Sequence, residues 1–211
     1  MSVVNLDKNY YFIHVPKTGG TSMEEHVGGL AHYSYRTIKR LIPSIDNYFG
    51  FAFVRNPWTR VISSFYHKPN NDDRNVTNAY PKNPSGFKRF VKERMRPNIG
   101  YEKQIYWYPE YPSGRIHHHF LPQYFFLCDK EENIKVDFIG NLESINEDWS
   151  YVSSKIFGDV KHLTKMNKSN FSFDFMSHFD DEESNNIILE FYKKDFECFG
   201  YSKDPRDALK R

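Results

Sequence analysis

The sequence predicts an α/β fold of three layers, in which helices cover both faces of a mainly parallel central sheet. Three short runs have the unbroken apolar character of buried parallel strands: Tyr10–Val15, Phe49–Val54 and Val136–Ile139. Helical patterns lie between and after these runs, and this alternation is typical of the fold class. We therefore expect the carboxyl ends of the strands to share one edge of the sheet, where such folds bind ligands.

The first strand, Tyr10–Val15, runs into a Lys-Thr-Gly-Gly-Thr-Ser turn that precedes helix-forming sequence. Two adjacent glycines let the backbone bend sharply and present its N–H groups outward. A helix that begins at Thr21 or Ser22 adds free N–H groups and the positive end of its dipole, so the segment predicts a site for a phosphate-like anion. An ordinary turn with a Thr21–Glu24 capping box is the alternative. The predicted anion-binding residues are Lys17, Thr18, Gly19, Gly20, Thr21 and Ser22.

The second strand, Phe49–Val54, leads into a helix that we expect over 57–67. Asn56 is a suitable N-cap and Pro57 suits the first helical position. Apolar residues recur along this segment at helical spacing, which predicts an amphipathic helix.

Two side chains near this junction predict a second phosphate site. Arg55 leaves the buried strand, and Ser63 falls on the flank of the apolar stripe of the following helix. The guanidinium can make bidentate contacts with a phosphate that the hydroxyl also binds. An ion pair between Arg55 and a nearby carboxylate is the alternative. Arg60 and Ser64 are expected to face further towards solvent.

Further helices follow from the same signals. Ser34 is a predicted N-cap for a helix between the two phosphate motifs. The segment Leu142–Phe157 has an amphipathic pattern that ends at Gly158, a predicted C-cap. Another such pattern covers Asp181–Asp195.

The glycine-rich turn differs from the ATP-binding loop of metal-dependent kinases. Lys17 precedes the two glycines, whereas the Walker A motif places its lysine after them. Val54 runs into Arg55, so no acidic residue follows this strand to hold magnesium. Both features disfavour a metal-dependent kinase.

The two phosphate motifs together resemble those of the PAPS-dependent sulfotransferases, in particular the carbohydrate branch that includes bacterial members and heparan sulfate 2-O-sulfotransferase. PKTGGTS is similar to the 5′-phosphosulfate loop of that family, and VRNPWTRVISSFYH to its 3′-phosphate motif. The likeness continues in the family's order through FLPQYFFL, VDFIGNLESINEDW, MNKS and FYKKDFECFGY, so it covers nearly the whole chain.

This resemblance implies a three-layer fold like that of the P-loop NTPases. It also implies transfer of a sulfuryl group from 3′-phosphoadenosine 5′-phosphosulfate (PAPS) to an acceptor hydroxyl on a carbohydrate, with 3′-phosphoadenosine 5′-phosphate (PAP) as the product. The displacement would be in line and would need no metal. Lys17 would stabilise the leaving oxygen, and Arg55 and Ser63 would bind the 3′-phosphate. A nucleotide kinase of related fold and an inactive sulfotransferase-like binding protein are the alternatives.

The transfer also requires a general base to take the proton of the acceptor. In the resembling family the catalytic histidine lies between the two motifs, which assigns the role to His32. A surface histidine at this position is the alternative, and a glutamate base is a further one. His14 lies within the first strand and is expected to be structural. The run His117–His119 is the rival group.

The acceptor side is predicted with less detail. We expect one histidine of the run, His119, to lie there near Gln123. A basic run that includes Lys88, Lys92 and Arg96 is expected to be a solvated helix face, and a groove for an acidic glycan is the sharper alternative. Aromatic residues at 106–108 can stack on sugar rings or pack the domain.

Composition sets the remaining expectations. The 211 residues predict a single domain over 1–211, with irregular excursions near 67–86 and 97–122. The net charge of +2 gives no indication of a nucleic-acid partner, and the sequence has no apolar run that would span a membrane. With only two cysteines and no apparent leader, the expected location is cytoplasmic. The acceptor and the oligomeric state stay open.

Overall fold

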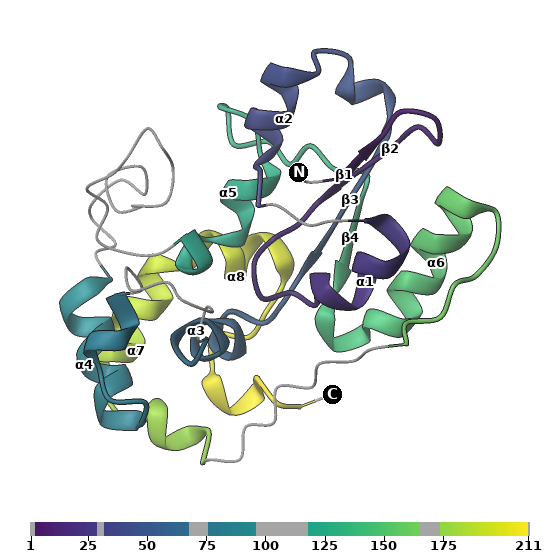
Figure 1. Ribbon diagram of the computed structural model, residues 1–211. Coiled ribbons are helices and arrows are strands. Elements are labelled where there is room, and N and C mark those ends of the chain that lie inside the picture. Colours follow the sequence, from purple (N-terminus) through teal and green to yellow (C-terminus); the bar gives the residue numbers. More distant parts are fainter. Residues whose placement is uncertain (1–2, 29–31, 68–75, 96–117, 165–173, 211) are drawn as a thin grey trace. The chain divides into compact units, whose positions relative to one another are not determined.

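A computed structural model describes residues 3–28, 32–67, 76–95, 118–164 and 174–210 (Figure 1). The chain divides into two compact units. The first unit comprises Met1–Arg55 and Gln123–Lys168, and the second comprises Asn56–Pro122 and Ser169–Arg211. We describe each unit by itself.

The first unit is built on a sheet in which each strand pairs with the next along the sequence. Its strands are β1 (Val3–Asn5), β2 (Tyr10–Ile13), β3 (Phe49–Val54) and β4 (Phe138–Asn141). β2 pairs with β3, and β3 with β4, in parallel, whereas β1 runs antiparallel to β2. The predicted α/β fold with a mainly parallel sheet is therefore confirmed, and the antiparallel edge strand β1 is an addition.

Helices lie on both sides of this sheet (Figure 1). On one side, apolar side chains of β2 and β3 form a single core with α1 and α6, in which Phe12 and Phe51 meet Met23 and Trp149. On the other side lie α2 and α5, which contact each other. These helices are α1 (Gly20–Val27), α2 (Tyr35–Leu41), α5 (Gln123–Leu127) and α6 (Ile145–Phe157), and the short 3-10 turns are η1 (Ile45–Asn47) and η5 (Leu142–Ser144).

The second unit is helical in its described part. Its core is rich in aromatic side chains, among them Trp58, Phe65, Phe87, Phe179 and Phe191. Burial of large aromatic rings supplies most of the apolar area of such a core. Its helices are α3 (Pro57–Phe65), α4 (Pro84–Arg94), α7 (Glu182–Phe191) and α8 (Lys193–Phe199), and its 3-10 turns are η2 (Val76–Ala79), η4 (His118–Phe120), η6 (Met176–His178) and η7 (Pro205–Asp207).

The predicted strands agree with the observed ones in place and differ at three ends. The second strand matches at Phe49–Val54, and the third both begins and ends two residues later than expected, at Phe138 and Asn141. The first ends at Ile13, because the chain folds back there and the Val15 N–H donates to the Ile13 carbonyl at 3.1 Å.

Helix ends show where local signals suffice. Asn56 caps α3 by accepting a hydrogen bond from the Trp58 N–H at 3.0 Å, and Ser34 caps α2 in the same way. Gly158 ends α6 with φ of 82°. The helix expected over 181–195 is instead α7 followed by α8, because the backbone leaves the helical conformation at Tyr192, where φ is −105° and ψ is 19°.

The basic run on α4 is paired with acidic side chains. Lys88 contacts Asp180 at 2.6 Å, and Lys92 contacts Asp181 at 3.0 Å and Glu183 at 2.8 Å. These pairs neutralise the charge that an acidic glycan would need, so they favour the solvated helix face.

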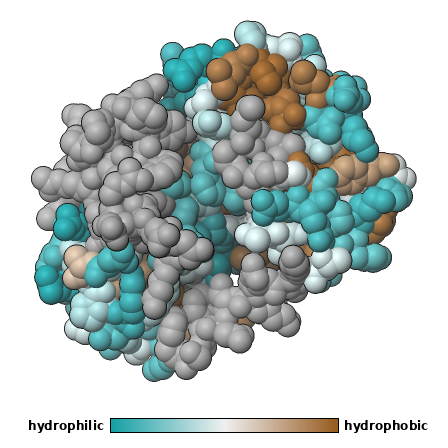
Figure 2. All heavy atoms as spheres, in the orientation of Figure 1, coloured by the Kyte–Doolittle hydropathy of each residue, from teal (hydrophilic) through white to brown (hydrophobic). Residues whose placement is uncertain are grey.

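The described surface is mixed in polarity. In Figure 2, brown spheres gather in the upper part of the view, near α2 of Figure 1, and Leu41 of that helix is 61% exposed. Exposed single leucines are common on protein surfaces, so we assign this area no role. Within the described ranges, every helix is too short or too polar to cross a membrane.

Candidate functional site

The loop after β2 adopts a conformation that is suited to hold an anion. Lys17 has φ of 69° and Gly19 has φ of 86°, so two left-handed residues flank Thr18. Backbone turns of this kind direct successive N–H groups into a concavity that binds anions. The Thr18 hydroxyl donates to the Val15 carbonyl at 2.8 Å and is fully buried, so it closes the loop from inside.

Helix α1 begins at Gly20, one residue before the earliest predicted start. Its N-cap is Gly19, and no side chain caps this helix, which places Thr21 inside the helix and excludes the predicted capping box. The Ser22 N–H turns back to the Gly19 carbonyl at 2.9 Å. A helix start without a side-chain cap leaves N–H groups for a ligand, and its dipole favours a negative charge there.

The loop packs closely on the terminal methyl groups of two residues at the start of α6. A Cβ atom there would lie 2.7 Å from Leu142 Cδ1 and 2.9 Å from Ile145 Cδ1. The positive φ of Gly19 also disfavours any other residue. The backbone of the loop 17–20, which we call the cradle, thus packs directly against the rest of the first unit.

Arg55 links the two predicted phosphate motifs. It follows β3 directly, is 6% exposed, and its Nη1 donates to the Lys17 carbonyl at 3.4 Å. β2 and β3 are parallel neighbours, so their carboxyl ends share one edge of the sheet, as expected. The structure therefore brings Lys17 and Arg55 together within the first unit.

Gln123 holds the main chain of Arg55 from both sides. Its Oε1 accepts from the Arg55 N–H at 2.8 Å, and its Nε2 donates to the Arg55 carbonyl at 2.8 Å. The side chain has no exposed surface. A clamp of this kind fixes the point at which the arginine leaves the strand, and sequence reasoning missed it. The predicted contact of Gln123 with an acceptor stays a prediction.

His32 lies beside His14, and one of its ring nitrogens faces the main chain of that residue. The ring centroids are 4.4 Å apart, and His32 Nδ1 lies 3.1 Å from the His14 carbonyl oxygen. A carbonyl only accepts, so Nδ1 of His32 carries the hydrogen and Nε2 of the neutral ring has the lone pair. Burial, helped by the nearby His32 and Lys17, lowers the pKa of His14 well below its usual value.

The remaining predicted residues with described positions belong to the second unit. Ser63 is half-buried on α3. His119 is buried on η4, where its ring contacts those of His67 and His118. Their assigned roles stay predictions.

Arg60 and Ser64 do not face solvent as predicted. Arg60 is 1% exposed and donates to the Leu121 carbonyl at 2.8 Å and the His119 carbonyl at 3.1 Å. Ser64 donates to the same His119 carbonyl at 3.0 Å. The helix is buried on more than its apolar stripe, so these polar groups hold η4 in place.

Several predicted segments lie outside the described residues. These are the MNKS motif at 166–169, the aromatic residues at 106–108, Arg96, His117, residues 68–75 of the first excursion and residues 97–117 of the second.

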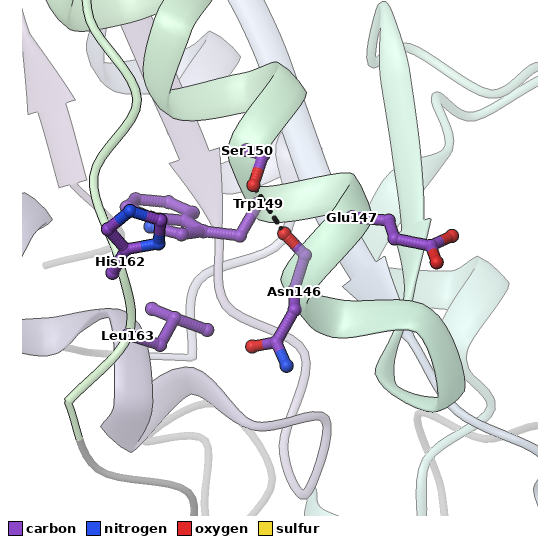
Figure 3. A pocket seen from close by; sticks show the side chains of 6 residues that line it. All are labelled: Asn146, Glu147, Trp149, Ser150, His162 and Leu163. Atoms are coloured by element: carbon purple, nitrogen blue, oxygen red, sulfur yellow. Dashed lines mark hydrogen bonds between the residues drawn. The ribbon is translucent and has the colours of Figure 1, made fainter.

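The first unit also has an open hollow on α6 (Figure 3). His26, from the last turn of α1, packs against Trp149 with ring centroids 5.4 Å apart, so the hollow lies at the opposite end of α1 from the loop. None of the predicted site residues lines it. Its lining residues are Asn146, Glu147, Trp149, Ser150, His162 and Leu163.

Comparison with known proteins gives one match. The model of the Sulfotransferase family matches residues 2–202, which is nearly the whole chain. The chain matches none of the curated proteins and none of the solved structures.

Proposed function

The chain belongs to the sulfotransferase family, and we propose that it transfers a sulfuryl group from PAPS to an acceptor hydroxyl on a carbohydrate and releases PAP. We further propose a three-layer fold like that of the P-loop NTPases and an in-line displacement that needs no metal. The observation that carries this proposal is the contact between Arg55 and the Lys17 carbonyl, which joins the two predicted phosphate motifs at one sheet edge.

The loop has the chemistry that a 5′-phosphosulfate requires. Its left-handed turns, its close-packed glycine and the uncapped start of α1 provide N–H donors for an anion. In an in-line transfer, negative charge grows on the leaving oxygen, and fixed donors stabilise it without rearrangement. By analogy with phosphoryl transfer, positioning and electrostatics supply most of the catalysis. Thr18, Gly19, Gly20, Thr21 and Ser22 would hold this group, and Lys17 would neutralise the leaving oxygen.

Arg55 would bind the 3′-phosphate of the nucleotide together with Ser63. A buried guanidinium with a fixed main chain suits bidentate recognition of a phosphate. The two hydrogen bonds of Gln123 hold the main chain of Arg55 in place. Arg55 would therefore lose little conformational entropy when it binds the 3′-phosphate.

His32 would act as the general base. Its hydrogen bond to the His14 carbonyl fixes the tautomer that leaves Nε2 unprotonated. A base with a fixed tautomer is ready to accept the proton of the acceptor hydroxyl. His119 and Gln123 would lie on the acceptor side, as the sequence predicts.

Nucleotide binding and turnover test this function separately. Isothermal titration with PAP in EDTA should give tight binding, and ATP with magnesium should bind more weakly. Radiolabelled PAPS with a panel of glycans should then give a labelled product. A preference for Mg-ATP would support a kinase instead, and PAP binding with no transfer to any hydroxyl acceptor would support an inactive binding protein.

A further inference from the structure

The side chain of His14 has no role in the function proposed above, although it lies at the centre of the site. It follows β2 directly and is 7% exposed. The sequence places it within a strand, where it is expected to be structural. Three observations on its ring lead to a different proposal.

The first contact is with the start of α1. An ideal Cβ at Gly20 would lie 2.0 Å from His14 Nε2, 2.3 Å from Cδ2 and 2.7 Å from Cε1. The ring therefore occupies the space of a side chain at position 20, and Nε2 is the ring atom nearest to that space. Glycine at this position is what allows the imidazole to reach the cradle.

The second observation concerns the other ring nitrogen. Nδ1 of His14 is buried, and among the described residues it has no hydrogen-bond partner. Buried N–H groups without a partner are rarer than buried acceptors without one. The hydrogen of the neutral ring therefore belongs on Nε2, the atom that lies against Gly20.

The third contact is with His32, whose ring centroid lies 4.4 Å from that of His14. The two rings then have opposite chemistry, since His32 has its lone pair on Nε2 and His14 has its N–H on Nε2. Burial also keeps His14 neutral at neutral pH, because it lowers the pKa of that ring. A neutral donor next to the base does not compete with it for the proton.

From this geometry we propose that His14 is a further catalytic residue, whose Nε2–H donates a hydrogen bond to an oxygen of the phosphosulfate group held at the start of α1. The inference rests on the proposed sulfuryl transfer, because it concerns the same anion. The bond would add a side-chain donor to the backbone donors of the cradle, on the side that faces the base. A preorganised donor of this kind stabilises charge that develops in the transition state.

A matched pair of variants tests the proposal. His14→Gln places an amide N–H near the position of Nε2, whereas His14→Asn places its amide near the buried Nδ1. We expect His14→Asn to lower kcat by roughly a hundredfold, as removal of one preorganised donor does, and His14→Gln to keep most of the activity. Equal activity of His14→Asn and the wild-type protein would overturn the proposal.

The tautomer of the wild-type ring provides a test that needs no turnover. Nitrogen NMR of protein with ¹⁵N-labelled histidine should show Nε2–H for His14, and PAP should shift that signal. The signal is assigned by its loss in His14→Gln. An Nδ1–H tautomer would overturn this inference alone and leave sulfuryl transfer in place. No binding of PAP by the wild-type protein would overturn both.

Discussion

Helices α1 and α3 both follow a parallel strand of the same sheet, and they begin in opposite ways. α3 has Asn56 as a side-chain cap, which accepts from the Trp58 N–H, and Pro57, which has no N–H, at its first position. α1 begins after a left-handed glycine with no side-chain cap. A side-chain cap satisfies helix donors from within the chain, whereas we propose that an anion completes the uncapped start of α1.

The polar groups near the two helix starts differ in the same way: those around α3 bind other parts of the chain, and those around α1 are backbone groups of a loop. Around α3, Arg60 and Ser64 are buried and donate to carbonyls of the segment 119–121, which makes them structural. Around α1, the backbone is shaped by left-handed residues and a close contact with α6. We therefore expect variants of the first set to affect stability and variants of the second to affect ligand binding.

The largest expected effect is the loss of turnover when Lys17, near the uncapped start of α1, is replaced. Lys17→Gln removes the charge at the leaving oxygen, and we expect a loss of roughly a hundredfold to a thousandfold in kcat. Thermal unfolding should be nearly unchanged, because the loop is shaped by its backbone. Lys39→Gln is the matched control, since Lys39 forms an exposed pair with Asp46 at 2.6 Å. Equal turnover of the two variants would contradict the role of Lys17.

The next effect concerns the glycine that precedes α1. Gly19→Ala and Gly158→Ala both place a side chain at positive φ, 86° and 82°, which costs about 1 to 2 kcal/mol of unfolding free energy. Only Gly19→Ala also meets Leu142 and Ile145, since a Cβ at Gly158 has nothing within 4 Å. We expect Gly19→Ala to lose about 1 kcal/mol more, the low end of the cost of overpacking, in urea denaturation, because the two terminal methyl groups can shift. Equal losses of unfolding free energy in both variants would show that the close contact does not affect stability.

The smallest effect is at the capped start. Asn56→Ala removes the cap of α3, and we expect a loss of about 1 kcal/mol in the free energy of unfolding. The affinity for PAP should stay close to that of the wild-type protein, because Gln123 holds the neighbouring Arg55 independently. Calorimetric unfolding and titration measure the two quantities. A large fall in affinity with unchanged stability would reverse the distinction between the two helix starts.

The sequence was a good guide where the signal was local. The second strand, the Asn56 and Ser34 caps and the Gly158 C-cap follow from residue types at fixed positions, and the structure has them as expected. The start of α1 was placed too late, because a glycine N-cap in the left-handed region has no side-chain signal.

Residues far apart in the sequence were harder to predict. The Gln123 clamp joins positions 68 residues apart, and no periodicity indicates such a contact. His14 was assigned a structural role because strand residues are usually packed away. Because Gly20 has no side chain, the His14 ring can pack against it, but this contact exists only in the folded chain.

We propose above all that Arg55 and the loop of Lys17 form one site for a nucleotide that carries both a 3′-phosphate and a 5′-phosphate. Titration of wild-type protein and Arg55→Gln with PAP and with adenosine 5′-phosphate tests it directly, and Arg206→Gln is the exposed control. We predict that Arg55→Gln weakens PAP binding by roughly tenfold to a hundredfold, the worth of a charge-assisted hydrogen bond, and leaves adenosine 5′-phosphate binding nearly unchanged. Equal losses for both nucleotides would contradict the account.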